Sequence, residues 1–428
     1  MKNLVINMSK FQTPRGMRDL TNEDLRYFDK IRKKCGKVAE FCGFKRIEPP
    51  ILESTELFKK GTGSNTEIVQ KQMYNLKTKG GKQLTLRPEG TPSVVRAYLE
   101  RGMESLPKPV KLWYFGPFFR HERPQAGRYR QLHQFGFESI GSESWIVDAQ
   151  IILMFYTILE DLGLKNLVIE INSIGDRSCR PHYNKILLDF LKKKQRFLCP
   201  DCKRRLKTNP LRIFDCKNEK CQEIVNQAPQ TLNYLCKDCH KHFKNVLETL
   251  DELQLPYNLN PYLVRGLDYY TRTVFEIISG SEENEGSLVG GGRYDELVEL
   301  LGGNETPACG GAAGIERIVS LMKKEGKKMR SLSKANVFLA QVGKLPKRKA
   351  LILMEEFRKA KIKIVESLHK NSLSTQLKRA GNLGIRYVLI MAQKEILDNK
   401  IILKDMKTGK QKKIPIDKVV KEIKKKVK

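Results

Sequence analysis

Two stretches in which hydrophobic and polar positions alternate lie on either side of a basic segment. Residues 112–119 and 132–140 are rich in aromatic side chains and follow a period of two, which predicts two strands of an antiparallel hairpin. The segment between them carries four arginines, Arg120, Arg123, Arg128 and Arg130. An arginine side chain binds phosphate through two parallel hydrogen bonds, so we expect the hairpin tip to meet a polyphosphate or a nucleic acid. A solvated basic loop is the alternative interpretation.

A second group of polar residues follows another short predicted strand. Residues 83–86 are expected to form this strand, and a turn broken by proline and glycine follows before a predicted helix. Glu89 and Thr91 lie in that turn. A carboxylate and a hydroxyl both accept hydrogen bonds, so together they are suited to bind an ammonium group.

Glycine-rich segments mark the later part of the chain. Residues 263–277 mix charged and aromatic positions and end as an alternating strand, and residues 288–298 contain three consecutive glycines. Glycines allow a close approach between backbone and ligand. Residues 309–322 form a glycine-rich run that leads into a predicted helix with Glu316 and Arg317 in its first turns. Such a run can reflect tight packing alone, so the order and completeness of the whole set carry the functional interpretation.

Taken in order, these segments resemble the motifs of the class II aminoacyl-tRNA synthetases. FRHERPQAGRYRQ resembles motif 2, GGAAGIERI resembles motif 3, and residues 38–74, with Pro49 and Pro50 ending a strand, resemble motif 1. RGLDYYTRTVFE and GGGRYDELV resemble the two blocks that distinguish the histidyl-tRNA synthetase family. The resemblance extends from residues 12–20 (QTPRGMRDL) to the C-terminal domain. It implies an α+β fold, with an antiparallel sheet core flanked by helices, and a homodimer assembled through motif 1.

The resemblance also implies a reaction and a set of site residues. The chain would activate histidine with ATP and Mg²⁺ to histidyl-adenylate and transfer the histidyl group to the 3′ end of tRNA(His). Its catalytic residues would be Arg120, Arg265 and Arg317. ATP would be bound by Arg120, Glu122, Arg128 and Arg317. Histidine would be bound by Glu89, Thr91, Gln134, Glu138, Arg265, Tyr269 and Tyr270, and Gln125 would contact the tRNA.

One pair of these residues also has a physical rationale that is independent of the family. Imidazole has a donor and an acceptor on opposite edges, which Glu138 and Tyr270 could satisfy together. An amino acid with a different side chain would leave a buried polar group unpaired, at a cost of about 1–3 kcal/mol for each such group.

Six cysteines form three closely spaced pairs, which are Cys199 with Cys202, Cys216 with Cys221, and Cys236 with Cys239. Thiolates with this spacing can bind one tetrahedral zinc ion, and two such pairs complete a structural site. We favour the first two pairs as the ligands, which leaves the third pair in excess or makes it part of a site shared with His240 or His242. A cluster of buried thiols without metal is the alternative.

Composition and charge agree with an RNA-binding protein. The chain has 80 basic and 48 acidic residues and a net charge of +32, which favours a polyanionic partner, although much of the excess is lysine spread over the chain. No apolar run reaches the roughly 20 residues of a membrane span, so no membrane association is expected. The clustered cysteines indicate a reducing compartment, and we predict a cytoplasmic location.

Changes in composition predict the domain boundaries. Residues 1–174 and 256–324 are expected to form the catalytic core, interrupted by a cysteine-rich insertion domain at 175–255, and residues 325–334 form a linker. In residues 335–428, strands are expected at 337–342, 362–366 and 387–392 and helices at 348–360 and 375–383. This alternation predicts a small α/β domain with a largely parallel sheet, and its position resembles the anticodon-binding domain of this synthetase subgroup.

Two other functions are compatible with part of the sequence. A non-catalytic, synthetase-like regulatory subunit of ATP phosphoribosyltransferase would share the core fold, but it would generally lack the C-terminal domain and several motif residues. A zinc-ribbon RNA-binding protein would account for the charge and the cysteines but not for the RGLDYY and GGGRYD blocks. Synthetases for proline, threonine or glycine would not need Glu138 paired with Tyr270.

Overall fold

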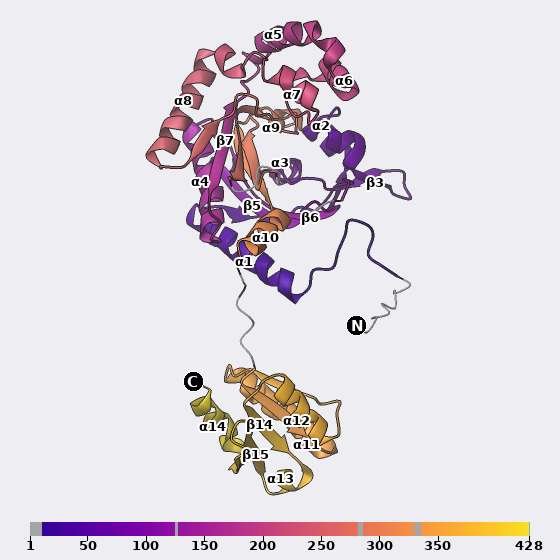
Figure 1. Ribbon diagram of the computed structural model, residues 1–428, viewed down its shortest axis with the longest axis vertical. Coiled ribbons are helices and arrows are strands. Elements are labelled where there is room, and N and C mark those ends of the chain that lie inside the picture. The colour runs from indigo at the N-terminus through magenta and orange to yellow at the C-terminus, as the bar shows by residue number, and fades with distance from the viewer. Residues whose placement is uncertain (1–10, 125–126, 281–285, 328, 330–334, 428) are drawn as a thin grey trace. The chain divides into compact units, whose positions relative to one another are not determined.

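The computed structural model describes residues 11–124, 127–280, 286–327, 329 and 335–427. The chain divides into two compact units, Met1–Lys328 and Met329–Lys428 (Figure 1). None of the helices formed by the described residues is long and apolar enough to cross a membrane.

The first unit is built on a sheet of eight strands among the described residues. Each inner pair of neighbouring strands is antiparallel, and a short parallel strand is added at each edge. The predicted antiparallel core is therefore confirmed. In spatial order the strands are β1 (Lys45–Arg46), β5 (Val110–Phe119), β6 (Gln131–Ile140), β11 (Ala308–Gly314), β10 (Val289–Arg293), β9 (Thr271–Ser279), β7 (Leu167–Ser173) and β8 (Tyr257–Leu259).

The predicted basic hairpin is the pair of strands β5 and β6, which run in continuous register from Val110–Ile140 to Phe119–Gln131. Successive side chains of a strand point to opposite faces of its sheet. The rings of Phe135 and Phe137 on β6 contact Phe155, at centroid distances of 5.7 and 5.2 Å. Phe155 belongs to helix α4 (Trp145–Asp161), so Gln134, Gly136 and Glu138 point to the opposite face.

Three helices cover the face that carries these phenylalanines. Helix α4 contacts α1 (Asn22–Phe41), and α1 also contacts α10 (Ile315–Lys324), whose first residues are the end of motif 3 (Figure 1). Helix α4 is apolar on most of its surface and is buried between α1, the sheet and α8 (Lys237–Glu252). The apolar layer leaves the other face of the sheet available for polar side chains.

A small antiparallel sheet and two helices flank that polar face. The strands β2 (Leu52–Ser54), β4 (Gln83–Leu86) and β3 (Tyr74–Lys77) are paired in this order, and β4 has the bounds that the sequence predicts. The turn after β4 leads into α3 (Thr91–Glu100), which packs against α2 (Thr55–Thr62). This arrangement holds Glu89 and Thr91 beside the main sheet.

The cysteine-rich segment is mainly helical. Its described residues form α5 (Arg180–Lys193), α6 (Pro200–Thr208), α7 (Glu219–Val225) and α8, joined by short 3₁₀ turns and without a strand (Figure 1). Its apolar residues share one hydrophobic cluster with the rest of the first unit, because Leu187 and Ile213 belong to the same cluster as Tyr98 and Leu112. The segment is thus packed continuously with the part that surrounds it.

The second unit has a five-stranded sheet, in the order β13 (Ile364–Glu366), β12 (Val337–Gln341), β14 (Tyr387–Met391), β15 (Lys400–Asp405) and β16 (Gln411–Pro415). The first three strands are parallel, and β15 and β16 are antiparallel. The sheet is therefore less parallel than the sequence predicts, because a terminal hairpin with Gly409 in its turn at φ +76° extends it. The helices are α11 (Lys344–Lys359), α12 (Leu373–Asn382), α13 (Gln393–Leu397) and α14 (Val419–Lys426).

Candidate active site

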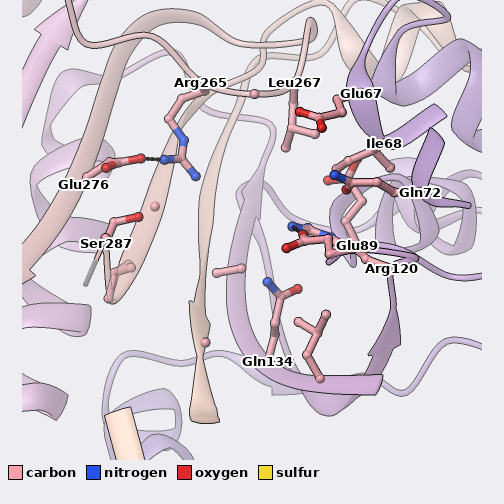
Figure 2. Close-up of a pocket in the computed structure, with 18 of the residues that line it drawn as sticks. Glu67, Ile68, Gln72, Glu89, Arg120, Gln134, Arg265, Leu267, Glu276 and Ser287 are labelled. Carbon is pink, nitrogen blue, oxygen red and sulfur yellow. Dashed lines mark ion pairs between the residues drawn. The ribbon is translucent and has the colours of Figure 1, made fainter. Parts of the chain in front are cut away.

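A cavity of about 550 Å³ opens on the polar face of the main sheet in the first unit. Its lining combines the β4–α3 turn, the β5–β6 hairpin, the strands β9 and β10 and the inserted segment. In Figure 2, Arg265, Glu276 and Ser287 lie on one side, Glu89 and Arg120 lie on the other, and Gln134 lies between them. Of the residues predicted from sequence, the cavity is lined by Glu89, Thr91, Arg120, Glu122, Arg128, Gln134, Arg265, Tyr269, Tyr270 and Arg317.

One of the predicted histidine-binding residues lies behind the cavity lining. Glu138 is fully buried and is not part of the cavity lining, although its hydrogen bond to Thr91 places it directly behind a lining residue. Gln125 lies outside the described residues.

Glycines on the central strands give the cavity its depth. A Cβ atom at Gly290 of β10 would overlap the guanidinium group of Arg265, and one at Gly310 of β11 would overlap the carboxylate of Glu138. Gly136 of β6 similarly makes room for the ring of Tyr114. The GGG and CGGAAG runs are therefore strand segments whose missing side chains leave space for large polar groups.

Arg265 crosses this glycine surface and forms an ion pair with Glu276 on β9. Its Nε atom is buried and has no hydrogen-bond partner among the described residues, so one donor of this cavity-lining side chain is unused within that part of the protein. From the inserted segment, Arg212 donates a hydrogen bond of 3.1 Å to the Arg265 carbonyl oxygen. The backbone that carries Arg265 is thus held from a part of the chain more than fifty positions away.

Glu89 is buried at the opposite side of the cavity. Its two carboxylate oxygens accept hydrogen bonds from the hydroxyls of Thr62 (2.5 Å) and Tyr269 (2.8 Å). Burial raises the pKa of Glu89, while these two hydrogen bonds and the charges of Arg120 and Arg265 oppose the shift. Tyr269 therefore orients the predicted ammonium-binding carboxylate. The sequence offered no signal for Thr62.

Glu138 forms a second buried carboxylate centre. It accepts hydrogen bonds from Thr91 (2.7 Å) and from the hydroxyl of Tyr294 (2.5 Å). Burial raises the pKa of Glu138 from 4.5 to about 8. Tyr294 belongs to the GGGRYD block, so that block contains the signal for this partner, although sequence reasoning did not assign it a role. Tyr270 is also buried, and burial raises its pKa to about 12.

Gln134 is a further polar group aimed into the cavity. Its Oε1 atom is buried and has no hydrogen-bond partner among the described residues, and its side chain lies between the two sides of the cavity in Figure 2. A buried amide oxygen that lacks a partner carries a free-energy penalty, which a ligand donor would remove.

Three arginines create a positive region at the hairpin end of the cavity. Arg120 donates a 2.8 Å hydrogen bond to the Pro88 carbonyl, and its guanidinium lies 3.9 Å from Glu122. Arg317 donates a 2.6 Å bond to the Ser287 carbonyl. Burial and then repulsion from Arg128 lower the pKa of Arg317, which indicates that these cations share one small volume.

Strand β6 and motif 3 are linked by a hydrogen-bonded pair that sequence reasoning did not identify. Glu316 at the start of α10 accepts from the backbone N–H of His133 at 2.9 Å, and it lies 2.7 Å from the His133 ring nitrogen Nδ1. This contact sets the position of α10 relative to β6, and it thereby places Arg317 on the same side as Arg120.

The inserted segment also contributes four charged residues to the cavity lining, namely Arg205, Arg212, Asp215 and Lys217. Arg205 donates a 3.0 Å hydrogen bond to the Arg212 carbonyl, and Asn209 donates one of the same length to Asp268. The sequence placed this segment in a separate domain, with no sign that it contacts the catalytic residues.

The six predicted zinc ligands fall into two groups. Cys199, Cys202, Cys216 and Cys221 place their sulfur atoms within 4.8 Å of one another, which is the set that the sequence favours. Cys236 and Cys239 lie instead with Asp176 and Cys179, whose ligand atoms show the same spacing. Neither histidine named as an alternative ligand joins a group, because His242 is bonded to Asp148 at 2.8 Å and His240 is exposed.

Comparisons with known proteins give one consistent result. The family profile described as "Histidyl-tRNA synthetase" matches residues 16–318, and that described as "Anticodon binding domain" matches residues 336–426. The chain is 44% identical to "Histidine--tRNA ligase" of Dehalococcoides mccartyi over 97% of its own length and 100% of the relative. It is 42% identical to the protein of that name from Acetivibrio thermocellus, covering 96% and 99%. The crystal structure of apo S. aureus histidyl-tRNA synthetase matches with a TM-score of 0.78 and 35% identity, covering 97% and 100%.

Proposed function

Because this chain belongs to the histidyl-tRNA synthetase family, we propose that the cavity of the first unit is where it activates histidine. The chain is a histidine–tRNA ligase, an aminoacyl-tRNA synthetase that forms histidyl-tRNA with conversion of ATP to AMP and diphosphate. A non-catalytic regulatory role is not favoured, since the chain retains Arg120, Arg265, Arg317 and a second unit of its own.

One observation carries the assignment of the site. Arg265 and Gln134 line the cavity together with Glu89 and Arg120, and each has a buried polar atom without a hydrogen-bond partner among the described residues. A ligand with an ammonium group, a carboxylate and phosphates would satisfy both the donors and the acceptors. Histidine together with ATP has this combination of groups.

In the proposed complex, Glu89, Thr91 and Gln134 bind the α-amino group of histidine. Tyr270 and Glu138 recognise the imidazole ring. Glu138 lies directly behind Thr91, whose hydroxyl donates a hydrogen bond to it. Tyr269 supports Glu89 through their 2.8 Å hydrogen bond. Because these groups are buried, an amino acid that cannot complete their hydrogen bonds is rejected.

Arg120 and Arg317, with Arg128 beside them, bind the phosphates of ATP, and Glu122 orients Arg120. Mg²⁺ enters with ATP, and Glu67 and Glu122 line the cavity with the oxygen ligands that this ion prefers. A carboxylate oxygen of histidine attacks the α-phosphorus, the bond from that phosphorus to the bridging oxygen breaks, and diphosphate leaves. Negative charge grows on the α-phosphate oxygens, where the guanidinium of Arg265 stabilises it.

In the second step, a terminal ribose hydroxyl of the tRNA attacks the histidyl carbonyl carbon, and AMP leaves. The hairpin tip, residues 123–130, is proposed to meet the acceptor end of the tRNA because Arg120 lies on the same hairpin. The family resemblance implies that these enzymes read an extra guanosine at the 5′ end of tRNA(His), and Gln125 is the residue we propose to contact it. Gln125→Ala should then narrow the difference in charging between tRNA with and without that guanosine, and unchanged discrimination would exclude Gln125.

The second unit, which matches the anticodon-binding family, is proposed to bind the anticodon stem of tRNA(His).

A homodimer through motif 1 is supported by exposed apolar side chains in or near that motif, namely Phe41 (90% exposed), Ile51 (45%) and Leu52 (44%). Sedimentation of active protein should give the mass of a dimer, and a fully active monomer would contradict this assembly. The cytoplasmic location remains a prediction.

We also propose a structural zinc ion at Cys199, Cys202, Cys216 and Cys221. Zinc–sulfur bonds of about 2.3 Å in a tetrahedron place the sulfurs about 3.8 Å apart, and the Cys199–Cys216 distance is 3.8 Å. Four thiolates leave no open coordination position, so the ion would stabilise the segment that carries Arg205 and Arg212 and take no part in the reaction.

ATP–diphosphate exchange measured with each of the twenty amino acids tests the assignment of the site. Histidine alone should support exchange above background, and Arg265→Ala should remove it. Efficient exchange with another amino acid, or undiminished exchange in the variant, would overturn the assignment.

A further inference from the structure

A second group of metal-ligating side chains lies outside the proposed zinc quartet. Cys179, Cys236, Cys239 and Asp176 place one ligand atom each within 4.8 Å of the others. The sulfur atoms of Cys179 and Cys239 are 3.8 Å apart, which equals the edge of a tetrahedron with zinc–sulfur bonds of about 2.3 Å. All ten cysteines, each in the described part of the chain, are free thiols.

The Cys236–Cys239 pair repeats the local geometry of the Cys199–Cys202 pair. Cys199 precedes α6 with φ −65° and ψ 163°, and Cys236 precedes α8 with φ −65° and ψ 164°. In each pair the first sulfur accepts a hydrogen bond from the backbone N–H of the second cysteine, at 3.5 and 3.4 Å. Each pair therefore directs its two sulfur atoms to one point. A tetrahedral ion at that point would need two further ligands.

The remaining ligands of the second group come from the start of the inserted segment. Cys179 is buried, and its sulfur lies 3.6 Å from Oδ1 of Asp176 and accepts the Asp176 backbone N–H at 3.3 Å. The other carboxylate oxygen of Asp176 accepts from Arg272 at 3.3 Å. The positive charge of Arg272 would balance part of the negative charge of three thiolates and a carboxylate. Its hydrogen bond also fixes the orientation of the Asp176 carboxylate.

We propose that Cys179, Cys236, Cys239 and Asp176 form a second structural zinc site, separate from the quartet of Cys199. Three sulfurs and one oxygen are a ligand set that zinc accepts, and a fully protein-coordinated ion is structural. The site joins the first residues of the inserted segment to the start of its last helix, because Asp176 and Cys179 precede α5, Cys236 directly precedes α8 and Cys239 lies in the first turn of α8.

The same group is hydrogen-bonded to the start of β9 and to the proposed histidine-binding Tyr270, which directly precedes that strand. The Arg272 N–H donates to the Gly175 carbonyl at 2.8 Å, and the Ile174 N–H donates to the Arg272 carbonyl at 2.9 Å. Arg180 donates to the carbonyl of Tyr270. The second ion therefore anchors the inserted segment beside Tyr270, a consequence that rests on the proposed function, whereas the binding of zinc does not.

Metal content tests the proposal. Full-length protein purified with a reductant and without chelators should contain two zinc ions per chain by elemental analysis. Cys239→Ser and Cys202→Ser should each retain one ion, and the double variant none. Cys42→Ser is the matched control, because Cys42 follows α1 outside both groups, and it should retain two.

Asp176→Asn provides a second test that keeps all thiols in place. The amide offers an oxygen ligand without the charge, so this variant should lose one ion to a chelator at a concentration that leaves both ions in the wild-type protein. One zinc per wild-type chain that Cys202→Ser removes and Cys239→Ser retains would overturn the second site and leave the quartet intact. A Cys179–Cys239 disulfide in protein kept under reductant would also overturn it.

Discussion

The guanidinium of Arg265 is held on one side by Glu276 and lies over Gly290, where any larger residue would displace it. Its Nε atom has no hydrogen-bond partner among the described residues. A cation placed where charge develops contributes mainly to the transition state and little to substrate binding. The geometry thus favours an effect on the rate of the reaction over an effect on affinity.

Arg265→Ala should therefore reduce the rate of adenylate formation by about 10²–10³-fold, while the affinities for ATP and histidine change by only several-fold. Rapid-quench measurement of enzyme-bound adenylate, with circular dichroism as a control for folding, separates the two quantities. Adenylate formation at nearly the wild-type rate would exclude this role for Arg265.

Glu138 makes the stability of the protein depend on pH. Burial raises its pKa from 4.5 to about 8, so between these values the folded state binds a proton that the unfolded state has released. The free energy of unfolding should then fall as the pH rises through this window, by up to about 1.4 kcal/mol per pH unit. The loss should be complete above about pH 8.

Glu138→Gln should reduce this slope, because the amide does not titrate. Urea unfolding at several values between pH 5 and pH 8 would measure the slope in both proteins. A residual slope is expected in the variant, since burial also raises the pKa of Glu89. Equal slopes in the two proteins would show that Glu138 is not protonated in the folded state.

Among the elements of the first unit, the inserted helices have a role that the sequence did not predict. The segment packs into the same hydrophobic cluster as α3 and β5, and through Arg212 it contacts the carbonyl of Arg265 at 3.1 Å. Arg212 also lies 3.5 Å from Asp215 and 4.0 Å from Asp268. It is therefore a positioning residue for the backbone of the RGLDYY block.

Arg212→Ala should lower kcat for diphosphate exchange by about tenfold, because small displacements of a catalytic group are costly, and it should leave the KM for histidine within about twofold. Arg204→Ala is the matched control: Arg204 is half-exposed on the same segment and pairs only with the nearby Asp201 among the described residues. A KM effect alone would indicate a contact with substrate instead of a positioning role.

At the scale of the whole molecule, the two units have separate hydrophobic cores. Val337, Leu389 and Ile423 belong to a cluster confined to the second unit, whereas the proposed active-site residues all lie in the first. Activation of histidine and recognition of the tRNA are therefore expected to be separable.

Deletion of residues 335–428 should leave histidine-dependent diphosphate exchange within about twofold of the wild-type rate. It should depress tRNA charging by about 10²-fold, which is the scale on which a linked second binding module contributes. Parallel assays of exchange and aminoacylation on the same preparation would measure both effects. Equal losses in the two assays would mean that the first unit depends on the second for its fold.

The sequence alone was sufficient for features that depend on local pattern. Alternation of apolar and polar positions predicted β5, β6 and β9 within a few residues, because neighbouring side chains of a strand must face different surroundings. The resemblance to the synthetase motifs indicated Glu89, Arg120 and Arg265 as site residues, and the fold brings them to one cavity. The terminal hairpin of β15 and β16 was missed, since β15 depends on pairing with β14 and β16 on pairing with β15.

Only the tertiary structure decided which distant groups meet. It brought Tyr294 to Glu138 and Arg212 to Arg265, and it separated Cys236 and Cys239 from the quartet and joined them to Asp176 and Cys179. No local pattern encodes these contacts, because their partners are separated by tens of residues in the chain and meet only once helices and strands have packed. Local spacing therefore determined the chemistry available to this protein, and packing determined where each group acts.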